Sequence, residues 1–339
     1  MSNFVVGQTM RPTQWYRFRI WALSALVASA TLCMAQAARS DDYPTRPIRI
    51  ILGFAAGRPT DVLSRIIADQ LNKSLGAPVL VENRLGAGGN VAATAVARAP
   101  ADGYTLLIGG TNYVIGHSWY KDIQFDILKD LQIVSTLSQN PNVLVVNPAS
   151  DMKTLSDVVQ KAKSEPGHLT FASSGAGTVV HLAGEIFKSR ENVSMRHVPY
   201  SGTNLPDLDL MAGRVDMMFD SLAVSLPFIR DNRLRAIGVT SKDRSSYAPE
   251  IPTLAELGLT GFDVTSWYAV WAPAGVPKDI VDKLNHAIVA ALATPEVKAR
   301  LATLQAEAFP NTPEAADQFQ RQELAKWTKA VELLGPRPE

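Results

Sequence analysis

The sequence predicts an α/β protein of two lobes, each a mostly parallel sheet flanked by helices. Strand-like apolar runs alternate with helical patterns in two successive series, which is typical of βαβ units. A length of 339 residues suits two domains of ordinary size. With 46% hydrophobic and 19% charged residues, the chain has the composition of a globular protein and can bury a sizeable core.

The amino terminus has the pattern of a secretory signal peptide over residues 1–37. Three arginines precede an apolar run of about 15 residues (20–34), and Ala35-Gln36-Ala37 is a small-x-small cleavage site. The run is shorter than the roughly 20 residues that span a bilayer, which favours cleavage over a retained anchor. Cys33, the single cysteine, lies inside this segment, so the exported chain would contain no disulfide. We therefore expect an exported protein.

The net charge argues against a nucleic-acid partner. The whole chain has a formal charge of +1. Cleavage after residue 37 would remove three arginines and no acid, which leaves a charge of about −2. Such a balance gives no basic surface for a polyanion.

The elements are expected in the following order. The first series has strands at 48–52, 78–81 and 104–108 and helices between Pro59 and Gly76 and at 91–99. The second series has strands at 143–146, 169–172, 195–198, 215–219 and 234–240, a helix at 155–164 capped by Thr154, and a helix at 179–188. A return segment at 262–271 leads to a helical region at 279–334 with breaks at Pro295 and 310–313. These runs predict a discontinuous first lobe (38–141 plus 262–339) and a second lobe (142–261).

The loop at 54–61 follows the first strand, where ligands of open parallel sheets bind. It reads Phe54-Ala55-Ala56-Gly57-Arg58-Pro59-Thr60-Asp61. Pro59 suits the first position of a helix and restricts Arg58 to an extended N-cap conformation. The free N–H groups of this helix start would attract an anion, although an ordinary turn without a ligand explains the loop equally well.

The second loop, Ser173-Ser174-Gly175-Ala176-Gly177-Thr178, gathers hydroxyl and backbone N–H groups around two flexible glycines. Such donors suit a carboxylate, whose oxygens accept several hydrogen bonds at once. No lysine follows the last glycine, as it would in a phosphate-binding P-loop, and neither serine has the spacing of a nucleophile elbow. The alternative is a helix start at which serine and threonine act as local caps.

A third small polar loop, Gly109-Gly110-Thr111-Asn112, follows the strand at 104–108, whereas the glycine run at 86–90 is interpreted as a tight turn. His181 lies one turn into the helix after the second loop, where it could face a ligand or be a buried structural histidine. No histidine has metal-ligand spacing to another His, Cys or acid, so no metal is expected. The histidines are His117, His168, His181, His197 and His286.

Several short runs together resemble the tripartite tricarboxylate transporter receptors, also called Bug-type or TctC-like solute-binding proteins. They cover nearly the whole chain after the signal segment, in order. The runs are Tyr43-Pro-x-Arg-Pro-Ile-Arg-Ile50, Phe54-x-x-Gly-x-x-Thr-Asp61, Val81-Glu-Asn-Arg-x-Gly-Ala-Gly-Gly-Asn90, Asp102-Gly-Tyr-Thr-Leu106, Asn142-Val-Leu-Val-Val-Asn147, Ala172-Ser-x-Gly-x-Gly-Thr178, Val198-Pro-Tyr-x-Gly202, Met218-Phe-Asp220 and Trp271-Ala-Pro-Ala-Gly-x-Pro277.

The resemblance implies a periplasmic receptor with the two-lobed periplasmic-binding-protein fold (type II). It implies a small organic anion as ligand: a di- or tricarboxylate, an acidic amino acid or an aromatic acid. Membrane subunits of a tripartite tricarboxylate-type transporter are the implied partners of a monomeric receptor without cofactor. The implied ligand contacts are Phe54, Ala55, Gly57, Arg58, Thr60, Asp61, Gly110, Thr111, Asn112, Ser173, Ser174, Gly177, Thr178, His181, Tyr200 and Asp220.

Arg58 departs from the resemblance, because family members usually have two adjacent glycines in the first loop. The arginine either changes the turn or places a cation at the mouth of the cleft, and its side chain points across that mouth or to solvent. Two other functions stay open. A sensor component without its own transporter would have the same sequence features, and a serine-dependent hydrolase would need a histidine and an acid beside Ser173 or Ser174. We expect a binding protein and not an enzyme.

Overall fold

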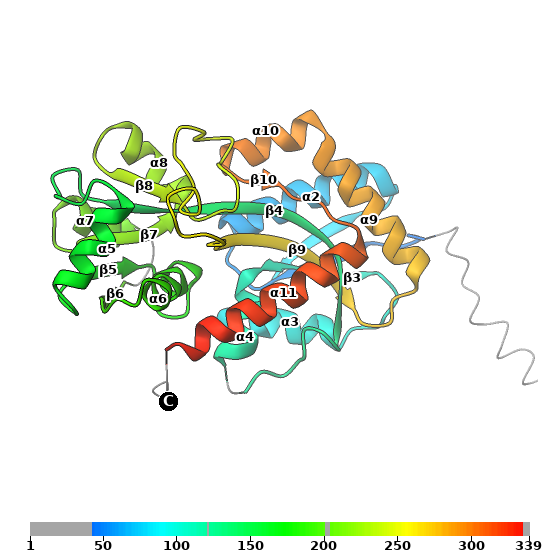
Figure 1. Ribbon diagram of the computed structural model, residues 1–339. Helices are drawn as coiled ribbons and strands as arrows, with labels where there is room; N and C mark the ends of the chain where they lie inside the picture. The colour runs from blue at the N-terminus through cyan, green and yellow to red at the C-terminus, as the bar shows by residue number, and fades with distance from the viewer. Residues whose placement is uncertain (1–42, 121, 201–203, 335–339) are drawn as a thin grey trace, which may run out of the picture. The chain divides into compact units, whose positions relative to one another are not determined.

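The computed structural model describes residues 43–120, 122–200 and 204–334, so the expected signal peptide at 1–37 lies outside the described residues. Contacts along the chain separate the compact unit Arg46–Glu339 from the segment Met1–Thr45, and the architecture below is that of the larger unit. This unit has two lobes of mixed α/β structure (Figure 1). Among the described residues, no helix is both long enough and apolar enough to span a membrane.

The first lobe contains the parallel strands β2, β1 and β3, followed by the antiparallel pairs β3–β9 and β9–β4. Its elements are β1 (Ile48–Leu52), α2 (Pro59–Leu75), β2 (Val79–Asn83), α3 (Asn90–Ala97), β3 (Thr105–Gly110), α4 (Thr111–Trp119), β9 (Thr265–Pro273), α9 (Lys278–Ala293), α10 (Pro295–Thr303), β10 (Glu307–Ala308) and α11 (Pro313–Glu332). The expected strands and helices of the first series are confirmed. Arg58 is the extended N-cap of α2 (φ −76°, ψ 157°), and Gly76 ends that helix in the left-handed conformation.

The second lobe contains the parallel strands β6, β5 and β7, with the end of β4 antiparallel to both β7 and β8. Its elements are α5 (Leu155–Ser164), β5 (Thr170–Ser173), α6 (Val179–Glu191), β6 (Arg196–Pro199), α7 (Asn204–Met211), β7 (Met217–Ser221), α8 (Leu222–Arg230) and β8 (Arg235–Val239). Thr154 caps α5 as expected, in a reciprocal capping box with Asp157.

Strand β4 (Leu131–Val146) joins the two lobes and changes partners along its length. Its residues up to Pro141 pair with β9, and its residues from Asn142 onward pair with β7 and β8 (Figure 1). A second connection follows β8, where the N–H of Val264 donates to the carbonyl of Thr240. The lobe boundaries stay a prediction, but the partner change falls beside the expected crossing near residue 141.

The sequence did not predict the first part of β4, because polar residues interrupt its apolar pattern. Ser135 and Thr136 are nevertheless buried, and their hydroxyls bond to the chain between α10 and α11. The amide of Asn311 in turn donates to Thr136 Oγ1 over 2.7 Å. The hydroxyl groups of Ser135 and Thr136 are thus satisfied although both residues are buried in a central strand.

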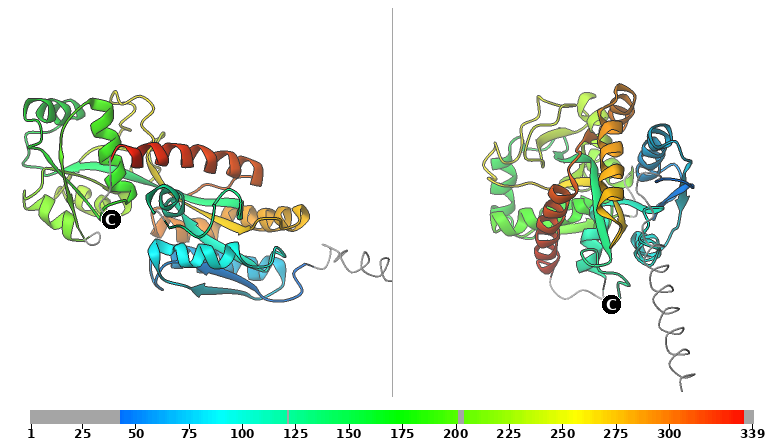
Figure 2. Two further views of the ribbon diagram at one scale, coloured as in Figure 1. Left: turned by 90° about the horizontal axis from the view of Figure 1, so that it is seen from below. Right: turned by 90° about the vertical axis from the view of Figure 1, so that its right-hand side faces the viewer.

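The carboxyl-terminal helices return to the first lobe. Helix α11 lies along β4 and packs against α4, and α9 packs against α2 and β4 (Figure 2). Trp267 and Trp327 are buried here, and the indole N–H groups of both donate to one carboxylate oxygen of Glu323, over 2.7 and 2.9 Å. This buried hydrogen-bonded cluster anchors α11 to β9 and holds the wall of the site described below.

Candidate functional site

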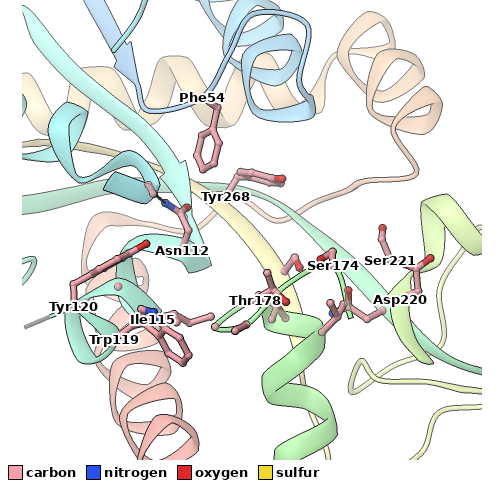
Figure 3. Close-up of a pocket in the computed structure, with 18 residues that line it drawn as sticks. Phe54, Asn112, Ile115, Trp119, Tyr120, Ser174, Thr178, Asp220, Ser221 and Tyr268 are labelled. Carbon is pink, nitrogen blue, oxygen red and sulfur yellow. Dashed lines mark hydrogen bonds between the residues drawn. The ribbon is translucent and has the colours of Figure 1, made fainter. Parts of the chain in front are cut away.

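A cavity of about 440 Å³ lies between the two lobes, at the ends of strands from both (Figure 3). Phe54, Asn112, Tyr120 and Tyr268 lie on the first-lobe side, and Ser174 and Thr178 face them from the second lobe. The full lining is Phe54, Gly88, Asn112, Ile115, Gly116, Trp119, Tyr120, Asn142, Ser174, Ala176, Gly177, Thr178, Val179, Val180, Asp220, Ser221, Ser266 and Tyr268. This volume suits a small organic molecule.

Among the described residues, the lining contains no lysine, arginine or histidine, and its one acid is Asp220. Three helices nevertheless begin at the cavity: α4 with Asn112, α6 with Val179 and Val180, and α8 with its N-cap Ser221. Helix starts carry unpaired backbone N–H groups and the positive end of the helix dipole. The cavity therefore offers partial positive charge from backbone groups in place of basic side chains.

The first loop is fixed from behind by Asp61. Its carboxylate accepts hydrogen bonds from the backbone N–H of Gly57 over 2.9 Å, from the Arg65 guanidinium and from Asn83. The bond from Arg65, with those from Gly57 and Asn83, lowers the pKa of Asp61 to about 2. Asp61 thus holds the loop shape while its own oxygens are occupied within the protein.

The predicted first-loop contacts fall into two groups. Phe54 lines the cavity, whereas Ala55, Gly57 and Asp61 lie outside it. Arg58 and Thr60 line an adjoining hollow of about 230 Å³, which shares Phe54, Asn112 and Tyr268 with the main cavity. The Arg58 side chain is exposed and makes no ion pair within the described ranges, so it remains free to meet an anion at this edge.

The third predicted loop is instead the start of a helix. We expected a small polar loop at 109–112, but Gly110 ends β3 and α4 begins directly at Thr111. Thr111 is buried, and its Oγ1 accepts from the N–H of Trp267 over 2.9 Å. Of this run, Asn112 lines the main cavity, Thr111 lines the adjoining hollow and Gly110 lines neither.

Within the second loop, Thr178 has both functions that the sequence left open. It is the N-cap of α6, where its Oγ1 accepts from the N–H of His181 over 3.3 Å and donates to the carbonyl of Gly175 over 2.7 Å. It also lines the cavity with Ser174 and Gly177. Ser174 has no hydrogen bond to the described residues, so its hydroxyl is available to a ligand.

Ser173 is completely buried and does not line the cavity. Its hydroxyl accepts from the N–H of Gly175 and bonds to Nε2 of His197 over 2.7 Å. This serine and histidine pair has hydrogen-bond geometry, but it lies beneath the loop. Ser174, the serine of this loop that lines the cavity, has no histidine or acid bonded to it among the described residues, so the arrangement that a serine hydrolase needs is not assembled at this loop.

His181 is a structural histidine beneath the second loop. Its Nδ1 accepts from the N–H of Gly177 over 3.1 Å, and its ring stacks on His197 with centroids 3.9 Å apart. Burial, together with the neighbouring His197 and Lys188, lowers the pKa of His181 to about 3, so the ring stays neutral and able to accept. The stacking of His197 on His181 was not predictable, because the position of a histidine on a strand does not reveal its stacking partner.

The last two predicted contacts also separate. Tyr200 lies outside the cavity, where its hydroxyl donates to Asp209 over 2.6 Å. Asp220 lies at the second-lobe end of the cavity beside Ser221 (Figure 3). Burial raises the pKa of Asp220 to about 8, with a further contribution from the charge of Asp207.

Sequence reasoning missed much of the first-lobe wall. Trp119, Tyr120 and Ile115 come from α4 and its end, which we did not predict, and Tyr268 comes from β9. The run Trp119-Tyr120, two aromatic residues at the end of a strand and helix unit, was the available signal. Nothing local in the sequence places Tyr268 opposite the second loop.

Comparison with known proteins identifies the family to which this chain belongs. The profile of the tripartite tricarboxylate transporter family receptor (TctC) matches residues 63–335. The chain belongs to this family. The receptor is similar to BugT of Bordetella pertussis (strain Tohama I), with 36% identity over 310 residues, which are 91% of this chain and 95% of BugT.

Solved structures agree with the family. The receptor resembles R. palustris Rpa4515 with adipate at 32% identity and a TM-score of 0.72, covering 88% of this chain and 100% of that chain. It resembles MatC from Rhodopseudomonas palustris with bound malate at 33% identity and a TM-score of 0.69, covering 85% and 100%. The predicted family and two-lobed fold are thereby confirmed, and the receptor is a solute-binding protein of the tripartite tricarboxylate transporter type.

Proposed function

We propose that this receptor captures a small organic carboxylate in the cavity between its lobes and delivers it to the membrane subunits of a tripartite transporter. The observation that carries the proposal is the meeting of three helix starts, those of α4, α6 and α8, at a cavity whose described lining residues include no basic side chain. Backbone N–H groups at helix starts bind carboxylates well and pair with them in fixed directions.

The polar side chains support the same ligand class. Asn112 from the first lobe and Ser174 and Thr178 from the second lobe face the cavity, so one carboxylate can be held from both sides. Phe54, Trp119 and Tyr268 supply apolar surface for the carbon skeleton. The adipate and malate bound by two relatives fit this combination of polar ends and apolar walls.

Arg58 favours a ligand with a second anionic group. It lies at the hollow that adjoins the cavity, beside Asn112 and Tyr268, where a second carboxylate of an extended acid would arrive. A guanidinium can bind a carboxylate through two parallel hydrogen bonds. We therefore place dicarboxylates ahead of monocarboxylates.

The test is a screen of purified receptor against adipate, malate and other small acids, by thermal shift and then by calorimetry. A ligand that binds only the folded state raises the melting temperature with concentration. We expect at least one dicarboxylate to bind with 1:1 stoichiometry, and the matched diamide not to bind. Binding of the diamide with equal affinity would contradict the carboxylate proposal.

Other functions receive less support. Ser173 is buried, and Ser174 has no partner among the described residues, which argues against a hydrolase. Turnover of an ester by the receptor would contradict this conclusion.

Capture and delivery also require export. We infer that cleavage after Ala37 releases the receptor into the periplasm, so mass spectrometry of osmotic-shock fluid should find a chain that begins at or near Ala38. Recovery of the uncleaved chain in membranes would contradict it.

A further inference from the structure

The second-lobe end of the cavity contains an unusual carboxyl group. Asp220 is the last residue but one of β7, is 1% exposed and lines the cavity. One of its oxygens accepts a hydrogen bond of 2.6 Å from Ser225 Oγ, in α8. A serine hydroxyl is a neutral partner, so this bond does not supply the positive charge that an ionised, buried carboxylate needs.

A second acid increases the difficulty. Asp207, on α7, is 2% exposed, and neither of its carboxyl oxygens has a hydrogen-bond partner among the described residues. Leu210 of α7 and Met218 of β7 pack in one buried cluster. Asp207 is three residues before Leu210 on the helix and Asp220 is two residues after Met218 on the strand, so both acids lie on the faces that pack together. Burial first, and then the negative charge of Asp207, raise the pKa of Asp220, as expected for two carboxyl groups buried on facing sides of α7 and β7.

Most charged and titratable groups of the surrounding elements are engaged elsewhere, Arg196 on β6 is exposed, and His181 on α6 accepts from the N–H of Gly177. On α7, Asp209 pairs with Arg214. On α6, Lys188 pairs with Glu185. Three arginines donate to backbone carbonyl groups: Arg190 on α6, Arg230 on α8 and Arg235 on β8. On β6, His197 bonds to Ser173, and Asp216, which precedes β7, bonds to Thr170. Strands β4 and β5 carry no titratable side chain.

Two neighbouring carboxyl groups without a cation cannot both be ionised at low cost. Each ionised group would be desolvated and would repel the other, so the pair keeps at least one proton to a higher pH than an isolated aspartate. The protonation state of Asp220 matters to the cavity, because the part of the lining that the structure describes has no basic side chain to offset a negative Asp220. An ionised Asp220 would repel an arriving carboxylate, whereas a protonated one would not.

We propose that Asp207 and Asp220 share a proton, and that the receptor captures its carboxylate with this pair protonated, so that ligand binding is coupled to proton binding. The proposal rests on the proposed function, because it assumes that an anion occupies the cavity. The pair is a proton site within lobe two, and it sets the pH range in which the receptor binds. Affinity for a carboxylate falls as the pH rises through the ionisation of Asp220.

The first part of the test needs no ligand. Carboxyl carbon NMR of receptor labelled in its aspartates follows the protonation of the pair from pH 4 to pH 10. We expect two coupled signals that titrate well above the normal range of aspartate. Asp207→Asn should leave a single one with a lower midpoint, because a like charge has gone. Normal titration of every aspartate signal would overturn the shared proton.

The second part measures malate and adipate binding by calorimetry at pH 6.5 and pH 9, where both acids are fully ionised. If only the form with protonated Asp220 binds and its pKa is about 8, Kd should be about tenfold higher at pH 9. Heats measured at pH 8.5 in buffers of different ionisation enthalpy should also show proton uptake.

Variants separate the pair from general electrostatics. In Asp220→Asn the ratio of the two Kd values should fall to about one, whereas Asp207→Asn should move the loss of affinity to lower pH. Asp243→Asn, which removes an exposed acid from the same lobe, is the matched control and should keep the wild-type ratio. Circular dichroism checks that each variant folds. Binding without pH dependence in the wild type would overturn the coupling while the carboxylate proposal stands. Failure of these and all other screened acids to bind at every pH would instead contradict the proposed function.

Discussion

Gly177 brings the second loop of lobe two against Trp119 of lobe one, and replacing it with alanine tests whether the lobes close over the ligand. Gly177 has a left-handed φ of +76°, and an added Cβ would lie 2.8–3.0 Å from three carbons of the Trp119 ring. Carbon atoms pack best at about 3.5–4.0 Å, so the ring or the lobe would have to retreat by roughly 0.7 Å or more. The substitution therefore has two separate costs.

The first cost is the strain of a side chain at positive φ, about 1–2 kcal/mol, which lowers the stability of the receptor whether or not it is closed. The second is overpacking against Trp119, typically 1–3 kcal/mol, which applies where the lobes meet. If binding requires this contact, Gly177→Ala should weaken affinity about 5- to 150-fold. Calorimetry with the best acid of the screen and urea unfolding measure the two costs separately.

Gly167→Ala is the matched control. Gly167 is in the same lobe and has almost the same φ, +77°, but the nearest atom to its added Cβ is Ser194 Oγ at 3.7 Å. We expect a similar loss of stability without loss of affinity. Trp119→Phe should restore part of the affinity of Gly177→Ala by making room for the methyl group. Equal affinities for Gly177→Ala and Gly167→Ala would refute the closure argument.

Three further predictions concern the cavity and the acid pair. Ser174→Ala should weaken carboxylate binding by about 1–3 kcal/mol without change in melting temperature, since Ser174 has no partner within the described residues, whereas Thr178→Ala should also cost about 1 kcal/mol of stability as a lost helix cap. Arg58→Gln should weaken binding of a dicarboxylate more than of the matched monocarboxylate, with a difference that shrinks in high salt; equal losses in calorimetry would remove Arg58 from recognition. Burial raises the pKa of Asp207 from 3.8 to about 6, so the folded receptor binds this proton more tightly than the unfolded chain. As the pH rises from about 4 to about 6, this group therefore lowers the free energy of unfolding by up to about 3 kcal/mol. In urea unfolding, Asp207→Asn should remove this part of the loss and leave the part that comes from Asp220; an unchanged pH profile would contradict the raised pKa of Asp207.

The regular part of the fold was predictable because local signals agree with it. The alternation of strands and helices, the Pro59 start and Gly76 end of α2 and the Thr154 cap of α5 all depend on residues close in sequence. The first part of β4 was not predictable, because the bonds that permit buried Ser135 and Thr136 come from residues about 175 positions away. A pattern of hydrophobic residues does not reveal hydrogen-bond partners that are so distant in sequence.

The candidate site was predictable on the second lobe and less so on the first. The hydroxyl groups of the loop at 173–178 are evident in the sequence, and Ser174, Gly177 and Thr178 of this loop line the cavity. The aromatic wall of Trp119 and Tyr268 depends on how α4 and β9 pack, which no single segment determines. Asp207 looks in sequence like an ordinary surface residue of a helix, and its burial beside Asp220 emerges only when the strands and helices of lobe two are assembled.

A crystal structure of the receptor with the tightest-binding dicarboxylate tests the central claim most directly. We predict one acid in the cavity between the lobes, with a carboxylate that contacts Ser174 or Thr178 from lobe two and Asn112 from lobe one. Its second carboxylate should point toward the hollow beside Arg58. Electron density for the acid at any other place on the protein, with only solvent in the cavity between the lobes, would contradict the account.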